Sequence, residues 1–211
     1  MERSTWLLLS SRGTLTCPLD KAEVDPMFQR AYAWMKMSLA DAGLPAPAPD
    51  LSPWWCWVKR GEDSSKPYIE DLAGLEDPVV LQLRVPANLI ALSCFDLWHF
   101  VLNRIYVYES VDDEAQFDQA VSNAEGGSEA AWLMEQRLQN SWLAIFELDQ
   151  LKVDMGPFES RTIQGCFWAL ERGYVTAVLE ASDLSSYEDT DSPLERRIQS
   201  ELAPPELADR P

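Results

Sequence analysis

One helix is marked at both of its ends, and this constrains the fold more than any other feature of the sequence. Asp25 can cap its first turn, and Pro26 suits the first helical position because its φ is already fixed near the helical value. Gly43 and then Pro45 end it, since proline cannot continue a helix. Between these signals apolar residues recur at helical spacing, at Phe28, Ala31, Tyr32, Met35 and Leu39. We therefore expect a helix that packs this stripe against a core.

Short apolar runs elsewhere predict strands, because apolar and β-branched residues bounded by turn residues are typical of them. The run 79–85 lies between two prolines and predicts a central strand. The run 54–60 is aromatic, and Trp54 should face away from Trp55 and Trp57 because side chains alternate along a strand. The remaining predicted strands are 5–10, 162–170 and 174–181.

Two more helices are indicated after residue 92, one of them carrying Asp96 and His99 and one running from Ser128 to Phe146. A weaker helix is expected over about 113–124 in an acidic surface excursion. The predicted buried side of the long helix comprises Trp132, Leu138, Trp142, Ile145 and Phe146. The whole predicts one α+β domain over residues 1–181, with a single mixed or antiparallel sheet packed with three to four helices. Residues 182–211 are rich in proline and acid and predict a largely solvated, acidic tail.

The charge of the chain limits its partners. Of 211 residues, 17 are Lys or Arg and 35 are Asp or Glu, which gives a formal net charge of −18. Such a charge repels phosphates, so we expect no direct contact with nucleic acid. Acidity serves solubility, or it allows the surface to occupy the basic groove of another protein. An acidic binding protein that blocks a nucleic-acid-binding partner is therefore one of two functional hypotheses.

Cysteine and histidine usage excludes a structural zinc site. The four cysteines Cys17, Cys56, Cys94 and Cys166 are far apart, and His99 is the only histidine, so no metal ligands are predicted. Apolar neighbours suit buried, reduced thiols, and no apolar stretch is long enough for a signal peptide or a membrane span. We expect a cytoplasmic protein without a membrane partner. A cysteine nucleophile assisted by His99 stays open.

The segment around His99 concentrates polar chemistry. On a helix Asp96, His99 and Asn103 project from one face, where a carboxylate can raise the basicity of an imidazole that moves a proton. The alternative is structural, because Ser93 and Asp96 have the spacing of a capping box.

Two other segments supply candidate ligand contacts. Trp55 and Trp57, with Lys59, Arg60 and Lys66 nearby, would form a stacking surface with a cationic rim, which suits a planar anionic ligand. The alternative is that this strand packs on both faces. Gln164 would be buried and needs partners for its amide, so it is either structural or faces a ligand.

The same segments resemble a small bacterial family known as domain of unknown function 3841. The likeness spans about residues 6–180 and implies a bacterial or phage-related cytoplasmic protein, with no known activity. The matching features are Trp6, the helix at 28–34, Trp55–Trp57, Ser93–His99, Leu102–Asn103, Ser141–Trp142 with Ile145–Phe146, and Ile163–Gln164 with Phe167–Trp168.

A fainter resemblance is to the ADP-ribosyltransferase superfamily, in the order of an early helix, an aromatic strand and a late strand. That superfamily carries a glutamate on the late strand, where this chain has Gln164 and its nearest glutamate, Glu159, lies upstream. The first strand also lacks a histidine, the nearest polar groups being those at 10–12. NAD as a substrate is what this resemblance implies, and no cofactor is otherwise indicated.

The leading hypothesis is accordingly a nucleotide-binding α+β domain, which as an enzyme would be a transferase acting on a nucleotide-type substrate. Its predicted ligand-binding residues are Trp55, Trp57, Lys59, Lys66 and Asn103. Its predicted catalytic residues are His99, Asp96 and Gln164.

Overall fold

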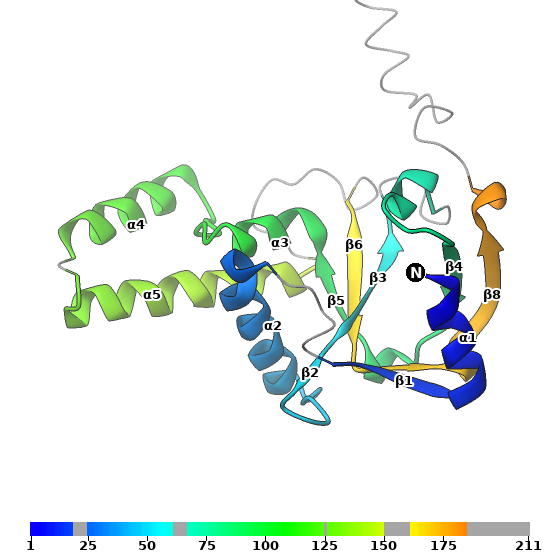
Figure 1. Ribbon diagram of the computed structural model, residues 1–211. Coiled ribbons are helices and arrows are strands. Elements are labelled where there is room, and N and C mark those ends of the chain that lie inside the picture. The colour runs from blue at the N-terminus through cyan, green and yellow to red at the C-terminus, as the bar shows by residue number, and fades with distance from the viewer. Residues whose placement is uncertain (19–24, 61–66, 125, 150–160, 185–211) are drawn as a thin grey trace, which may run out of the picture.

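The computed structural model describes residues 1–18, 25–60, 67–124, 126–149 and 161–184 (Figure 1). Its helices are α1 Arg3–Arg12, α2 Gln29–Asp41, α3 Phe95–Leu102, α4 Val111–Asn123 and α5 Glu129–Ser141. Its strands are β1 Thr14–Pro18, β2 Leu51–Ser52, β3 Trp54–Lys59, β4 Val79–Leu83, β5 Ala91–Cys94, β6 Ile163–Phe167, β7 Ala169–Glu171 and β8 Val175–Glu180. The chain is an α+β protein, as the sequence predicts. Of the predicted tail, residues 185–211 lie outside the described residues.

All strand pairs in the described part of the chain are antiparallel, but they form three small sheets in place of one. Their strand orders are β2–β1–β7, β3–β6–β5 and β4–β8. The predicted strand 162–170 is divided at Trp168, where the chain leaves the second sheet and enters the first. The indole of Trp168 is buried there, and its Nε1 donates to the carbonyl oxygen of Leu44 at 2.8 Å. The strand predicted at 79–85 forms β4, but its predicted central position is wrong, because within the described residues it pairs with β8 alone in the two-stranded sheet.

The helix marked at both ends is confirmed as α2 with its preceding 3₁₀ turn, Pro26–Phe28. The carboxylate of Asp25 accepts from the backbone N–H of Met27 at 2.8 Å, and Gly43 ends the helix with φ +84°. Its core-facing side chains are Ala31, Trp34, Met35 and Leu39.

The predicted strand at 5–10 is wrong, because these residues form helix α1. A strand would alternate its leucines between two faces, whereas here only Leu9 is buried and Leu7 and Leu8 are exposed. The helix is fixed at its start by Arg3, which pairs with Asp77 at 2.9 Å and with Glu180 at 2.5 Å.

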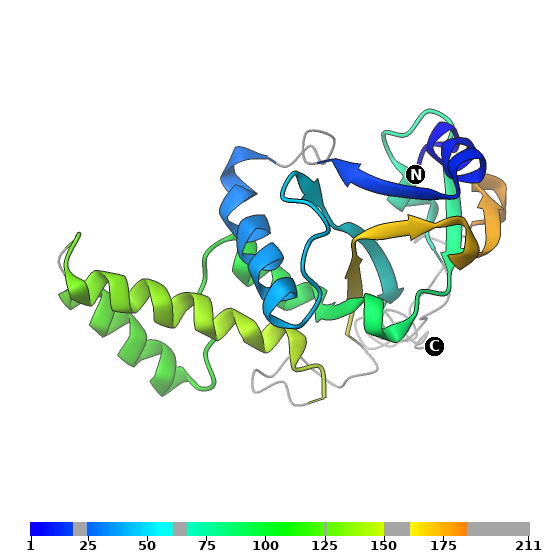
Figure 2. The ribbon, with the colours of Figure 1, turned by 90° about the horizontal axis from the view of Figure 1, so that it is seen from below.

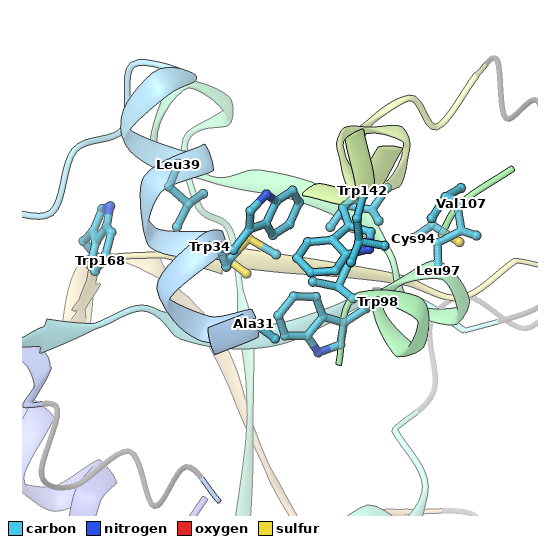
Figure 3. Packing of buried hydrophobic residues seen from close by; sticks show 14 of the residues in the cluster. Ala31, Trp34, Leu39, Cys94, Leu97, Trp98, Val107, Trp142 and Trp168 are labelled. Carbon is cyan, nitrogen blue, oxygen red and sulfur yellow. The ribbon is translucent and has the colours of Figure 1, made fainter. Parts of the chain in front are cut away.

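Two hydrophobic clusters cover opposite faces of the sheet β3–β6–β5. Trp55 belongs to the cluster under α2 and α3, whereas Trp54 packs with Leu9 and Phe167 in the other, so the predicted alternation is confirmed. In the first cluster the indoles of Trp34 and Trp142 meet edge to face, 5.5 Å between ring centroids (Figure 3).

Helices α4 and α5 form a hairpin that projects from the rest of the molecule in both views (Figures 1 and 2). We call residues 110–141 the arm. Ser110 and Ser128 cap its helices, each hydroxyl accepting a backbone N–H of the first turn. At its base the rings of Tyr106 and Phe117 stack at 4.1 Å. The arm thus packs, through Phe117, against the segment that precedes it.

The predicted burial of α5 holds only where that helix meets the body. Leu138, Trp142 and Ile145 are buried, but Trp132 is 60% exposed because it lies in the outer half of the arm. The predicted helix 128–146 also changes to a 3₁₀ helix at Trp142. No helix among the described ranges is long and apolar enough to cross a membrane.

Substitution of Gly165 should be destabilising because this glycine lets side chains approach β6 closely. A Cβ there would lie 2.5 Å from Cδ1 of Ile90 and 3.2 Å from Sγ of Cys56. We expect Gly165→Ala to lower the free energy of unfolding in urea by ~1–3 kcal/mol through overpacking.

The matched variant is Ile90→Val, which removes the Cδ1 atom at the shortest contact. The double variant should be more stable than the sum of the two single effects, because each change relieves the other. Additive effects would show that the close approach at Gly165 is not what matters.

Candidate functional site

Gln164 lies in the middle of a row across the second sheet. It is paired with Trp57 on β3 and with Ser93 on β5, and residues directly opposite each other in antiparallel strands point to the same face. Gln164 and Ser93 are buried, and the Gln164 Nε2 donates to the Ser93 hydroxyl at 3.2 Å. The amide is therefore held by the sheet beneath Trp57.

An aromatic row continues from this point onto α3. The indole of Trp57 meets the ring of Phe95 edge to face at 4.7 Å, and Phe95 meets the imidazole of His99 in the same way at 4.6 Å. Trp57 is 42% exposed, and His99 is also exposed. We call Trp57, Phe95 and His99 the aromatic row.

A cation covers the Trp57 end of the aromatic row. The guanidinium carbon of Arg60 lies 4.6 Å from the centre of the Trp57 ring and 5.1 Å from that of Tyr68. An ion pair with Asp71 fixes this guanidinium. The ring contacts and the ion pair together therefore hold the Arg60 guanidinium in one orientation.

Two more cationic side chains lie near this end of β3 and β6. The Lys59 Nζ donates to the carbonyl oxygen of Arg161 at 3.1 Å, so Lys59 crosses to the start of β6. The Arg161 guanidinium in turn donates to the carbonyl oxygen of Leu148 at 2.9 Å. Lys59 therefore reaches the predicted neighbourhood, and Arg161 joins it. Lys66, the second predicted lysine, lies outside the described residues.

The imidazole of His99 presents one nitrogen outward. Its Nδ1 lies 3.1 Å from the carbonyl oxygen of Phe95, and a carbonyl only accepts, so this hydrogen bond places a proton on Nδ1. In the neutral ring Nε2 is then the proton acceptor. Asp96 lies one turn earlier on α3 and is partly exposed, but no hydrogen bond joins it to His99 within the described chain.

The remaining polar predictions on α3 have structural explanations. Asn103 closes the helix, its side-chain Nδ2 donating to the carbonyl oxygen of His99 at 2.8 Å. The predicted capping box of Ser93 and Asp96 is wrong, because Ser93 lies inside β5 and the helix begins two residues later, at Phe95. The Ser93 hydroxyl accepts from Gln164 and so is not at the helix end.

Trp55 does not join Trp57 in a shared stacking surface. Its indole packs against Tyr32 and Trp98 at 5.7 and 5.2 Å, where α2 and α3 cover this part of β3. Among the described residues its buried Nε1 has no hydrogen-bond partner, which costs free energy, and Trp55 as a whole is half-buried whereas Trp57 is exposed.

The thiols are poorly suited to nucleophilic chemistry. Burial raises the pKa of Cys56 to about 11, and it also raises the pKa values of Cys94 and Cys166. A thiol held neutral is a weak nucleophile, which disfavours the alternative of a cysteine acting with His99. Across the described residues no group of three or more His, Cys, Asp or Glu side chains is placed to hold a metal ion.

Sequence reasoning missed Phe95, which joins Trp57 to His99, and Tyr68, which lies beneath Arg60. Phe95 could have been found, since it lies four residues before His99 on the same helix face. Tyr68 could not, because it reaches Arg60 from across the segment 61–66.

We expect Cys56, Cys94 and Cys166 to resist alkylation by iodoacetamide at about pH 8 in the folded protein. With a pKa of about 11, Cys56 is a thiolate in only about one molecule in a thousand at that pH. The measurement is intact mass after labelling, with urea-denatured protein as the control in which all four cysteines react. Rapid labelling of any of the three in the folded protein would contradict the burial described.

The same shift gives a pH dependence of stability. Because folding raises the pKa of Cys56 from 9.0 to about 11, its contribution is complete below pH 9 and is lost as the pH rises towards 11. Unfolding free energies of the wild type and Cys56→Ser should therefore converge over that range.

Comparison with known proteins identifies a family but no activity. The model of the family described as domain of unknown function (DUF3841) matches residues 18–176, which include α2, the second sheet and the aromatic row. No curated protein and no solved structure matches the chain.

Proposed function

This chain belongs to the DUF3841 family, whose description names no activity, and we propose from the geometry of its site that the aromatic row binds a nucleotide-type ligand. The observation that carries the proposal is an exposed indole, Trp57, with the guanidinium of Arg60 stacked on it and ordered by Asp71. Bases stack on such rings, and a nearby guanidinium suits the phosphate of the same ligand.

The local charge supports this choice of ligand. The protein has a formal net charge of −18, so an anion is repelled by most of its surface. Lys59, Arg60 and Arg161 gather at one end of β3 and β6, beside the exposed indole. Asp71 offsets one of these three charges, so Lys59 and Arg161 supply the positive charge that a phosphate would meet while its base lies on Trp57.

His99 supplies the candidate for proton transfer. The side chain is exposed at the far end of the aromatic row, its Nε2 is the ring nitrogen not bonded to Phe95, and Asp96 lies one turn away. Gln164 is better suited to positioning Trp57 than to contacting a ligand, because it is buried and bonded to Ser93. The resemblance to ADP-ribosyltransferases makes NAD one ligand to test. The free cysteines among the described residues support a reducing, cytoplasmic setting.

The test measures the binding of ADP, NAD and ribose 5-phosphate by titration calorimetry and their effect on Tm by thermal unfolding. We expect ADP and NAD to bind and to raise Tm, and ribose 5-phosphate, which has no base, to bind at least tenfold more weakly. Trp57→Ala should weaken ADP binding by roughly tenfold or more, since stacking of a base on an aromatic ring is worth ~1–3 kcal/mol.

The matched control is Trp132→Ala, because Trp132 is also an exposed indole and lies on the arm, away from the aromatic row. It should leave ADP binding unchanged. Equal affinity of wild type and Trp57→Ala for ADP, in variants that unfold as cooperatively as the wild type, would overturn the proposal.

The arm favours a second candidate function, binding to a basic protein partner. Its outward side chains combine acids with exposed apolar residues, a composition that suits a basic and partly apolar groove. They are Val111, Asp112, Asp118, Val121, Glu129, Trp132 and Leu133. Asp113 does not belong to this set, because it accepts hydrogen bonds from Tyr106 and Arg137 at the base of the arm.

The probe for this candidate is a fluorescent amphipathic peptide of leucine and lysine, with binding read by anisotropy. Trp132→Ala and the double variant Asp112→Asn/Asp118→Asn should each weaken binding several-fold, and Trp57→Ala should not. Added salt should weaken the wild-type interaction, because exposed charges are screened. Binding that ignores both salt and the arm variants would exclude the arm as the docking surface.

A further inference from the structure

A cavity of about 250 Å³ opens between α2 and α5, apart from the aromatic row. None of its lining residues belongs to that row. The residues that matter here are Arg30, Trp34, Arg104, Glu135, Gln139 and Trp142. A dry cavity of 150 Å³ can hold benzene, so this volume suits one substituted ring and is too small for a nucleotide.

The floor of the cavity is aromatic. Trp34 and Trp142 are buried and meet edge to face, and Figure 3 shows their indoles side by side. The Nε1 of Trp142 donates to the carbonyl oxygen of Ile105 at 2.8 Å, so this polar atom is already satisfied. Trp34 is 6% exposed and Trp142 1%, so the floor offers only a narrow strip of aromatic surface, which favours the edge of a flat apolar group.

The wall of the cavity carries a closed set of polar contacts. Arg104 has a left-handed backbone, φ +56°, which is uncommon for a residue with a side chain. Its Nη2 donates to Glu135 at 2.6 Å, and the amide of Gln139 donates to the other carboxylate oxygen at 2.7 Å. Partial burial opposes ionisation of Glu135, but these hydrogen bonds, together with the positive charges of Arg104 and Arg30, outweigh it and lower its pKa. Arg104 and Glu135 therefore neutralise each other.

Arg30 adds a second positive charge near Glu135 and helps to lower the pKa of that carboxyl. Its side chain is exposed and makes no hydrogen bond or ion pair with any part of the described chain. Counting Arg30, Arg104 and Glu135 together, the cavity has a net charge of +1, in a protein that is otherwise strongly acidic. A single negative charge on the ligand would balance it.

We infer that this cavity binds a small aromatic monocarboxylate, with the edge of its ring against Trp34, which packs on Trp142, and with its carboxylate on Arg30. A guanidinium can hold a carboxylate through two parallel hydrogen bonds. The net charge of one favours a monoanion over the dianion of a phosphate ester. The site is separate from the nucleotide site proposed above and does not depend on it.

The test is a titration with phenylacetate, phenylacetamide and phenyl phosphate. Binding is read from the indole N–H resonances of Trp34 and Trp142 in ¹⁵N-labelled protein. We expect phenylacetate to shift both resonances with a millimolar Kd, and the neutral amide and the phosphate ester to bind at least roughly fivefold more weakly. A stronger response to phenyl phosphate would overturn the choice of a carboxylate.

Arg30→Gln should weaken phenylacetate binding at least roughly tenfold and, being at an exposed position, should leave the fold intact. Arg12→Gln is the matched control, because Arg12 is also an exposed arginine without a hydrogen bond or ion pair in the described ranges. The Trp57→Ala variant should bind phenylacetate like the wild type. Equal affinity of Arg30→Gln and wild type, or unmoved Trp34 and Trp142 resonances, would overturn the inference.

Discussion

Burial of β6 on both of its faces is the constraint on which the rest of the structure depends. All five of its residues, Ile163–Phe167, are buried, and strands pair with it on both sides. A strand in this position must satisfy every polar group internally, and Gln164 does so by bonding to Ser93. It must also leave room for both clusters, and Gly165 does so by lacking a Cβ where Ile90 approaches. The aromatic row owes its position to this strand, because Trp57 lies opposite Gln164.

Local signals in the sequence predicted those elements whose ends carry their own chemistry. Asp25, Pro26 and Gly43 mark α2, and Ser128 marks the start of α5, in each case through bonds within one helical turn. Elements defined by an apolar run alone were less certain. The leucines of α1 suit a strand as well as a helix, and the contacts of the helix with the rest of the protein, among them the pairs of Arg3 with Asp77 and Glu180, come from residues far along the chain. No local pattern contains that information.

The same distinction applies to the site. The register of β3, β6 and β5 places Trp57 opposite Gln164, and Phe95 on α3 links Trp57 to His99. The sequence could not show that Trp55 is covered while Trp57 is exposed, because that depends on where Tyr32 and Trp98 lie. Nor could it assign Asn103 to the end of its own helix. Whether a side chain is structural or accessible depends on which other elements cover it, and the spacing of residues along the chain does not show this.

The arm begins and ends at the same place on the body. The Ser141 hydroxyl accepts the backbone N–H of Val107 at 3.0 Å, and the Trp142 indole donates to the carbonyl oxygen of Ile105. The segment that enters the hairpin and the segment that leaves it are thus hydrogen-bonded to each other at the base of the arm. A change in the length or sequence of such a hairpin therefore leaves the packing of the body unchanged. Sequence differences among relatives should therefore concentrate in the helices of the arm, while the contacts of Ser141 and Trp142 at its base are retained.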